Sequence, residues 1–410
     1  MRFKLRNLRF STGWPYVAVL NTEDAKRLGV HPFDRIKIRH NSKTWVAILD
    51  VARSNSYVGN GEIGIFEELS AAMGCNRGTF VSVTPAPKPK SINYIRKKMN
   101  GYQLRKEEIF EIVRDITERR LSDVELTYFV DSFYINGFTE NEIVWLTEAM
   151  IKTGTKLSFG RRIIVDKHCI GGVPGNRTTM IVVPIITANG FIMPKTSSRS
   201  VTSPAGTADT MEVLANVTFN AEQIKAIIKR VGGCIAWGGA VNLAPADDQI
   251  IRVEHPLAID AEGQLIASVI AKKASVSATH LLIDIPFGLH AKCKTHNSAK
   301  RLGQKFLTLA SKFGIKTHIT LTDGSEPIGN GIGPALEAID VMKVLSNEPD
   351  APLDLKVKSL YLAGILLEMI GKSNKGEGFE LARKTLESGK ALKKMNEIID
   401  AQGRKVKDYR

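Results

Sequence analysis

The sequence predicts an α/β protein in which a small β-rich segment precedes a helical segment and then a long alternating one. Three observations support this class. Short apolar runs separated by turns fill residues 1–84, helical periodicity dominates residues 91–153, and strands alternate with helices after Arg161. Alternation of this kind is typical of a mainly parallel sheet covered by helices. A chain of 410 residues is long enough for two or three domains.

The N-terminal segment is expected to be a small β-rich domain followed by a linker. Its candidate strands are residues 16–20, 35–38 and 45–49. Residues 84–90 carry three prolines, which block both helical and sheet hydrogen bonding, so they predict a linker.

The next segment has two clear helix signals. An apolar stripe at helical spacing is formed by Ile109, Ile112, Val113 and Ile116. Thr139 precedes an acidic run and is a plausible helix N-cap.

Composition narrows the class of protein and its partners. The four cysteines are widely spaced, so neither a zinc site nor a disulfide framework is expected, and a reducing cytoplasm is the expected setting. No signal peptide or bilayer-spanning run is recognisable, so no membrane partner is expected. The chain has 57 Lys and Arg residues against 42 Asp and Glu residues, a net charge of 57 − 42 = +15, which could allow it to bind a nucleic acid. Its spread without interleaved aromatic residues instead favours solvated faces and a site for small anions.

The most informative stretch runs from a β-like segment, residues 162–165, into a loop and then an apolar helix-like run, residues 180–183. The loop holds Lys167, His168 and three glycines. In such a loop, several backbone N–H groups and a lysine ammonium could bind one anion together. The histidine could then act on whatever that anion reacts with. Residues 167–179 are called the anion loop below.

The anion loop resembles the phosphate loop of the thymidine phosphorylase family. Its sequence, Lys-His-Cys-Ile-Gly-Gly-Val-Pro-Gly-Asn-Arg-Thr-Thr, is most similar to the branch of AMP phosphorylases and type 2 thymidine phosphorylases. That branch has serine where this chain has Cys169. A second matching block spans residues 193–212. Shorter ones lie at residues 251–252, 259–260, 267–268, 271–273, 321–324 and 333–337, so the resemblance covers most of residues 1–400.

The resemblance implies a domain organisation. It assigns residues 1–84 to the N-terminal domain, in which residues 21–30 resemble part of a double-psi barrel. It makes residues 91–158 and 246–277 a discontinuous helical lobe, and residues 159–245 and 278–410 the α/β phosphate-binding lobe. A further C-terminal family domain would begin near residue 403 and is expected to be absent from this chain.

The resemblance also implies a phosphate pocket. Its expected lining residues are Lys167, Cys169, Thr179, Ser197 and Thr207. A lysine with hydroxyl and backbone donors suits a divalent anion. A thiol donates a weaker hydrogen bond than a hydroxyl, so Cys169 predicts a raised phosphate requirement. The alternative is that Cys169 only packs while its backbone N–H serves the anion.

Base contacts and catalysis are implied for a second set of residues, namely His168, Arg252, Ser268, Lys272 and Asp260. Positive groups aimed at base carbonyls would stabilise a departing anion. Asp260 matches the proton donor of AMP phosphorylases, although an aspartate before Gly263 could simply cap a helix or turn. His168 could alternatively be a structural hydrogen-bonding group.

Nucleotide binding is implied for a third set. These residues are Gly172, Ser198, Arg199, Ser200, Val201, Thr202, Ser203, Thr207, Ser268 and Lys292. The hydroxyl-rich run 198–203 suits a phosphate ester, but it is also ordinary loop chemistry. No cofactor is expected, because phosphate is a substrate. His280, His290 and His296 follow no metal-ligand spacing, so no metal is expected.

Phosphorolysis of a nucleoside is therefore the leading hypothesis, with thymidine as the first substrate and AMP as the alternative. The family also implies a homodimer formed through the helical lobe. An anthranilate phosphoribosyltransferase would need an acidic magnesium-binding pattern, which is not evident near Asp323. A different class, a non-catalytic nucleic-acid or partner-binding protein, is disfavoured by the intact Lys167-His168 pair.

Overall fold

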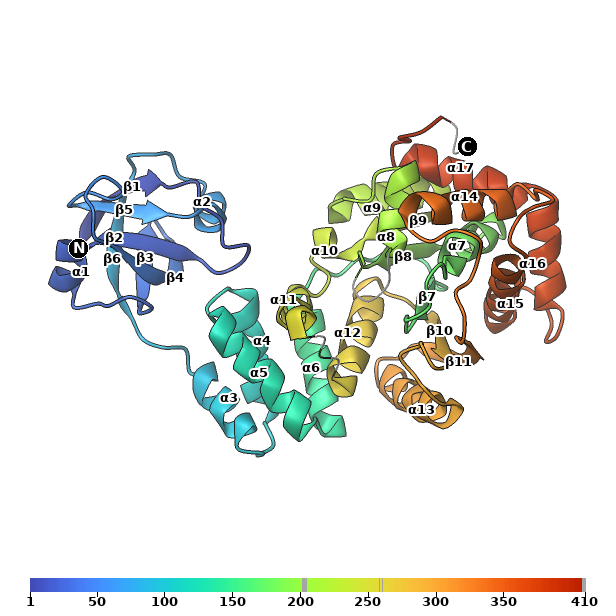
Figure 1. Cartoon of the computed structure of the whole chain (residues 1–410), viewed down its shortest axis with the longest axis horizontal. Coiled ribbons are helices and arrows are strands. Elements are labelled where there is room, and N and C mark those ends of the chain that lie inside the picture. The colour runs from blue at the N-terminus through green and yellow to red at the C-terminus, as the bar shows by residue number, and fades with distance from the viewer. Residues whose placement is uncertain (201–204, 258, 260, 408–410) are drawn as a thin grey trace. The chain divides into compact units, whose positions relative to one another are not determined.

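A computed structural model describes residues 1–200, 205–257, 259 and 261–407 of the chain (Figure 1). The chain forms two compact units. The first comprises Met1–Ala149 and Ala246–Ala261, and the second comprises Met150–Pro245 and Glu262–Arg410. The predicted nucleotide-binding residues Val201, Thr202 and Ser203 and the predicted proton donor Asp260 lie outside the described residues.

A closed six-stranded barrel begins the first unit. Its strands are β1 (Arg2–Asn7), β2 (Val17–Asn21), β3 (Arg35–His40), β4 (Lys43–Ala52), β5 (Glu62–Ile65) and β6 (Phe80–Ala86). Their order is β1-β5-β2-β4-β3-β6, and β6 pairs back onto β1. Alternate side chains such as Phe3, Leu5 and Ile36 fill its core. The β-rich N-terminal segment is confirmed, whereas its double-psi connectivity stays a prediction.

Two short helices, α1 (Thr22–Leu28) and α2 (Glu67–Met73), belong to the barrel segment. Strand β6 extends three residues into the stretch expected to be a linker, and Pro85 pairs in register with Ile36. A proline is tolerated there because it lies next to the end of its strand.

Helices form the rest of the first unit. They are α3 (Ser91–Met99), α4 (Lys106–Thr117), α5 (Asp123–Asn136), most of α6 (Glu140–Thr153) and α11 (Pro245–Glu254), followed by a 3-10 turn (His255–Leu257). The predicted stripe on α4 is confirmed, because all four of its residues are buried. The predicted cap is also confirmed, since Thr139 Oγ1 accepts from the Glu142 backbone N–H at 3.3 Å.

Parallel strands form the centre of the second unit, as predicted. They are β7 (Val165–Cys169), β8 (Met193–Ser197), β9 (Gly233–Trp237), β10 (His280–Phe287) and β11 (Lys316–Asp323). One sheet has the order β11-β10-β7, and β8 pairs with β9. A parallel bridge between Ile164 and Ile192 links β7 to β8. All carboxyl ends within each sheet therefore meet at one edge.

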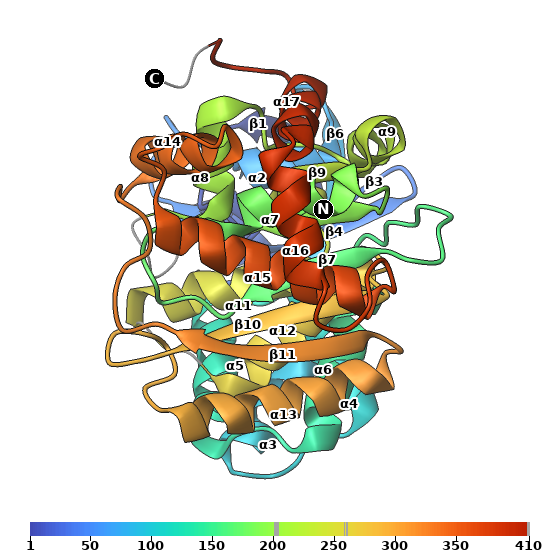
Figure 2. The ribbon, with the colours of Figure 1, turned by 90° about the vertical axis from the view of Figure 1, so that its right-hand side faces the viewer.

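The helices of the second unit cover these strands. They are α7 (Thr178–Ala188), α8 (Thr207–Leu214), α9 (Ala221–Val231), α10 (Gly238–Val241), α12 (Glu262–Ser275), α13 (His296–Lys312), α14 (Pro334–Leu345), α15 (Leu353–Met369), α16 (Gly378–Glu387) and α17 (Lys390–Ala401). Helix α7 is almost wholly buried, and α15 and α17 pack against it (Figure 2). This apolar centre fixes the start of α7, where the anion loop ends.

Among the described residues, no helix is both long enough and apolar enough to cross a membrane.

Candidate active site

The carboxyl ends of β7 and β8 carry most of the predicted phosphate-pocket residues. Lys167, His168 and Cys169 are the last three residues of β7, Ser197 ends β8, and Thr207 begins α8. Ligands of open parallel α/β sheets bind at this edge, where strands lead into helix N-termini. The fold therefore brings these residues to the edge at which an anion is expected.

Lys167 is fully buried at the base of the anion loop. Its Nζ donates to Thr178 Oγ1 at 2.8 Å, and Thr178 Oγ1 in turn donates to Asn176 Oδ1 at 3.1 Å. Burial lowers the pKa of the Lys167 ammonium. Thr178 was not predicted from the sequence, where the neighbouring Thr179 was selected instead. The sequence showed that two threonines end the motif. Only the path of the loop shows which of their hydroxyls bonds to Lys167.

Cys169 faces the same side of β7 as Lys167, because alternate strand residues share a face. The Asn176 amide donates to its Sγ at 3.2 Å. Burial raises the pKa of the Cys169 thiol to about 11. The thiol is therefore protonated at neutral pH and can donate its S–H, as a serine hydroxyl would.

Two glycines allow the anion loop to pass close to other backbone. Gly172 has φ of 90°, and a Cβ there would lie 2.7 Å from the Lys292 backbone nitrogen. Gly175 has φ of 73°, and a Cβ there would lie 1.9 Å from the Ile328 carbonyl oxygen. Only glycine fits both the conformation and the space. The Gly172 contact brings the predicted nucleotide residue Lys292 beside the loop.

The opposite face of β7 carries Asp166 and His168. Asp166 Oδ2 forms a buried ion pair with Lys273 Nζ on α12 at 2.8 Å. Lys195 on β8 is also buried, and its Nζ donates to the Thr196 carbonyl at 2.8 Å. Burial, followed by the charge of Lys273, lowers the pKa of Lys195 well below its usual range. Neither Asp166 nor Lys195 was predicted from the sequence as a site residue.

His168 is held neutral by these surroundings. Burial lowers its pKa well below the usual range, and the charges of Lys273, Lys195, Lys167 and Lys272 lower the pKa further. A neutral imidazole can donate one hydrogen bond and accept another. Lys272 thus lies within electrostatic reach of His168, and Ser268 is one helical turn earlier on α12.

Arg252 belongs to the first unit rather than to this cluster. There its Nη1 and Nη2 donate to the two carboxylate oxygens of Asp123 at 3.0 and 2.5 Å. Its Nε donates to Gln249 Oε1 at 2.9 Å. Its contact with a base stays a prediction.

Arg199 has acidic and aromatic partners. Its Nη1 lies 3.0 Å from Asp209 Oδ1 and 2.6 Å from Glu212 Oε2. Its guanidinium also lies over the Trp237 ring, 5.0 Å from the centroid. The two carboxylates offset the positive charge that a phosphate ester would need.

Arg177 is a buried organising residue that was also not predicted from the sequence. It pairs with Glu337 at the start of α14 and donates to the carbonyl of Ala205. Its Nη1 also donates to Thr207 Oγ1 at 3.3 Å. One side chain of the anion loop therefore fixes the position of Thr207, a predicted phosphate ligand.

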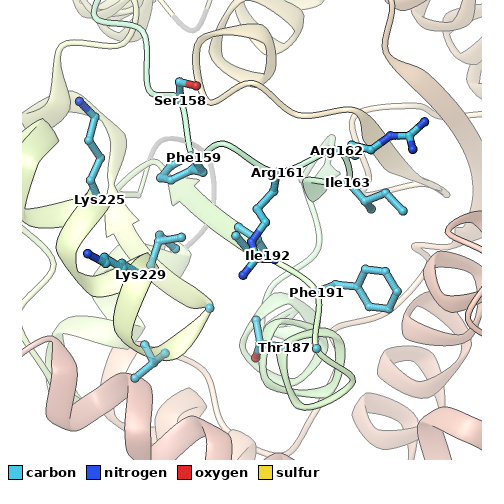
Figure 3. Close-up of a pocket in the computed structure, with 14 residues that line it drawn as sticks. Ser158, Phe159, Arg161, Arg162, Ile163, Thr187, Phe191, Ile192, Lys225 and Lys229 are labelled. Carbon is cyan, nitrogen blue, oxygen red and sulfur yellow. The ribbon is translucent and has the colours of Figure 1, made fainter.

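A hollow of about 830 Å³ lies at the other ends of the strands (Figure 3). It is bordered by Arg161 and Arg162 before β7, Phe191 before β8, and Lys225 and Lys229 on α9. Because ligands of such sheets bind at the carboxyl ends, we do not place the active site there. No group of three or more His, Cys, Asp or Glu side chains within the described ranges is arranged to hold a metal ion.

The fold and these residues together define a glycosyl transferase with a helical bundle and an α/β domain. Residues 92–154 match the model of the glycosyl transferase family helical bundle domain, and residues 161–392 match that of its a/b domain. The chain also resembles anthranilate phosphoribosyltransferase from Thermus thermophilus, with a TM-score of 0.62 and 19% identity over 75% of this chain and 98% of that chain. At that identity, the likeness shows the fold alone.

Relatives of higher identity specify the branch. AMP phosphorylase 1 of Archaeoglobus fulgidus is 47% identical over 98% of this chain and 79% of its own length. A putative thymidine phosphorylase of Rhodopseudomonas palustris is 48% identical over 97% and 78% of the two chains. The AMP phosphorylase of Methanococcoides burtonii is 45% identical over 98% and 79%. The chain belongs to this family of thymidine and AMP phosphorylases, and it is a pentosyltransferase enzyme.

Proposed function

We propose that this enzyme cleaves the N-glycosidic bond of thymidine with inorganic phosphate, giving thymine and 2-deoxyribose 1-phosphate. The observation that carries the proposal is the anion loop. Buried Lys167 and the neutral thiol of Cys169 lie on one face of β7, and neutral His168 lies on the other. Thr178, at the start of α7, accepts a hydrogen bond from Lys167. Residues on one face of β7 would thus bind the phosphate, and a residue on the opposite face would bind the base.

In this mechanism, the phosphate pocket positions the nucleophile. A phosphate oxygen attacks the anomeric carbon as the bond to the base breaks, so negative charge moves onto the base. Lys167 and the hydroxyl and thiol donors would hold the phosphate, with Thr179, Ser197 and Thr207 as further proposed ligands. Holding the phosphate in line with the anomeric carbon removes much of the entropic cost of the reaction.

The departing base is stabilised by His168 and Lys272. A neutral imidazole donates an N–H to a base carbonyl, and the Lys272 ammonium adds positive charge where the anion develops. Arg252, Ser268 and Asp260 are proposed to complete the base contacts, Asp260 as a proton donor if the base is a purine. These three roles rest on the motifs that they share with the family.

AMP is the second candidate substrate, with adenine and ribose 1,5-bisphosphate as products. The relatives named AMP phosphorylase favour it. The hydroxyl-rich run 198–203 would then hold the 5′-phosphate with Gly172, Thr207 and Lys292. The pairing of Arg199 with Asp209 and Glu212 supports placing thymidine first, because these acids would oppose a second phosphate.

A homodimer through the helices of the first unit completes the proposal. Helix α5 exposes an apolar stripe at helical spacing, with Val124 64% exposed, Tyr128 50% and Ile135 70%. Exposed apolar side chains on one helix face are common at protein–protein interfaces.

The test is a phosphorolysis panel on the purified enzyme. Thymidine, uridine, AMP, CMP and UMP are each incubated with phosphate, and the free base is quantified by chromatography. Base release from thymidine but not from AMP supports the proposal, and the reverse result replaces it with the AMP reaction. No release from any of the five substrates refutes phosphorolysis of these compounds.

A further inference from the structure

The buried end of the anion loop holds more positive than negative charge. Asp284 Oδ2 on β10 lies 3.9 Å from Lys167 Nζ and 3.6 Å from the Nζ of Lys358 on α15. The three side chains are 1%, 0% and 12% exposed for Lys167, Asp284 and Lys358. With all three ionised, two ammonium groups face one carboxylate, which leaves a net charge of one positive unit.

Neither distance is a hydrogen bond, because both exceed the range for N–H···O contacts. Asp284 Oδ1 accepts from Thr322 Oγ1 at 2.6 Å. Within the described part of the chain, however, Asp284 Oδ2 and Lys358 Nζ have no hydrogen-bond partner, although both atoms are buried. Buried polar atoms are nearly always satisfied, so such a pair indicates a site for a polar ligand or water.

Lys358 lies within electrostatic reach of the loop residues that already point to an anion. Its charge acts on both the pKa of Lys167 and the pKa of the Cys169 thiol, although burial and other charges have larger effects. Helix α15 packs on α7 and β10, and the neighbouring Leu355 and Ser359 are fully buried. The backbone that carries Lys358 is therefore fixed relative to β7.

We propose that Lys358 is a second ammonium group for the inorganic phosphate, acting with Lys167 at the base of the anion loop. This inference rests on the proposed function. The charges of Lys167 and Asp284 cancel each other. Lys358 therefore supplies the excess positive charge that attracts a phosphate anion. It also supplies N–H donors that have no hydrogen-bond partner among the described residues.

The experiment compares three variants with the wild type. Lys358→Met removes the ammonium but keeps much of the apolar stem, Lys358→Arg keeps the charge, and Lys356→Met is the control on the same helix. The KM for phosphate and for nucleoside is measured with each, and phosphate binding is measured separately by the phosphate-dependent rise in Tm.

Loss of a charged hydrogen-bonding group from such a site corresponds to a roughly 10- to 100-fold weaker affinity. We expect Lys358→Met to raise the KM for phosphate by about that factor, to leave the nucleoside KM within about two-fold, and to reduce the phosphate-dependent rise in Tm. Lys358→Arg should restore much of the affinity, and Lys356→Met should behave as the wild type.

The outcomes separate this inference from the proposed function. If wild type and Lys358→Met are stabilised equally by phosphate, the role of Lys358 is refuted while phosphorolysis stands. If the wild type neither binds phosphate nor releases base, the proposed function itself is refuted. Should Lys358→Met fail to fold, Lys358→Gln is compared with Lys358→Arg, and equal phosphate affinity in that pair refutes the inference.

Discussion

At the scale of single residues, Cys169 has the plainest consequence for phosphate affinity. Its protonated thiol donates more weakly than a hydroxyl would. We expect Cys169→Ser to strengthen phosphate binding by about 1 kcal/mol, which lowers the KM for phosphate about five-fold.

Steady-state kinetics at saturating nucleoside provide the measurement, and Cys75→Ser in the barrel segment is the control. An unchanged KM for phosphate in Cys169→Ser would show that the thiol only packs and that the backbone N–H serves the anion.

His168 gives a prediction about pH. Because burial and the neighbouring lysines hold its pKa well below 6.5, the imidazole stays neutral at pH 7 and protonates only in more acidic solution. We expect kcat/KM to be flat near pH 7 and to fall only as the pH drops well below 6.5. Replacing Lys273 by Met removes the strongest nearby positive charge, raises the pKa of His168, and moves the acid limb to higher pH.

The pH profile of kcat/KM measures this shift, with Lys312→Met on α13 as the control. The charges of Lys195, Lys167 and Lys272 also act on His168, and Asp166 shares its face of β7. All four residues remain in the variant. An acid limb that does not move in a folded Lys273→Met enzyme would contradict the assigned cause.

At the scale of elements, the anion loop depends on its close approach to the segment after β10. Gly172 and Gly190 have nearly the same φ, 90° and 91°, but a Cβ at Gly190 would meet nothing within 4 Å. The two Ala variants therefore share the backbone strain, and only Gly172→Ala adds a clash with the Lys292 backbone.

We expect both variants to lose about 1 kcal/mol of stability from the positive φ, and Gly172→Ala to lose about ten-fold more activity than Gly190→Ala because the loop shifts. Unfolding in urea and kcat/KM are measured for both. Equal activity in the two would mean that the loop tolerates displacement.

The chain's strand–helix pattern was sufficient to predict the order of the β-rich, helical and alternating segments, because periodicity is local. It predicted a strand at residues 162–165 with Lys167 and His168 in the following loop, which was wrong in its bounds, because the strand spans Val165–Cys169 and these residues end it. It could not identify Arg177, whose partners Thr207 and Glu337 lie 30 and 160 residues away. Nor could it show that Thr178 accepts from Lys167, because that contact depends on the loop path.

At the scale of the whole molecule, the barrel is joined to the helices of the first unit by partly buried polar contacts. The Arg35 side chain, 4% exposed, pairs with Glu125 and donates from Nε to the Arg120 carbonyl at 3.0 Å. Arg119 Nη1 donates to the Trp14 carbonyl at 3.0 Å. Arg35→Met removes the ion pair with Glu125 and the hydrogen bond to Arg120. We expect it to weaken the attachment of the barrel to these helices.

The expected result for Arg35→Met is faster proteolytic cleavage near residues 87–90 with unchanged phosphate-dependent stabilisation, because the anion loop lies in the second unit. Limited proteolysis and Tm with and without phosphate measure the two effects, with Arg39→Met on the same strand as the control. Equal cleavage rates in the two variants would show that the Arg35 contacts do not hold the barrel.

The sequence alone determined the α/β class, the β-rich N-terminal segment, the family and the anion loop, because periodicity, turn residues and motifs are written in consecutive residues. Only the tertiary structure decided which groups surround that loop. The Asp166–Lys273 pair, the Arg177–Glu337 pair and the cluster of Lys167, Asp284 and Lys358 join residues far apart in the chain. Burial by elements distant in the chain also sets the protonation states of His168 and Cys169. The local sequence cannot predict that burial.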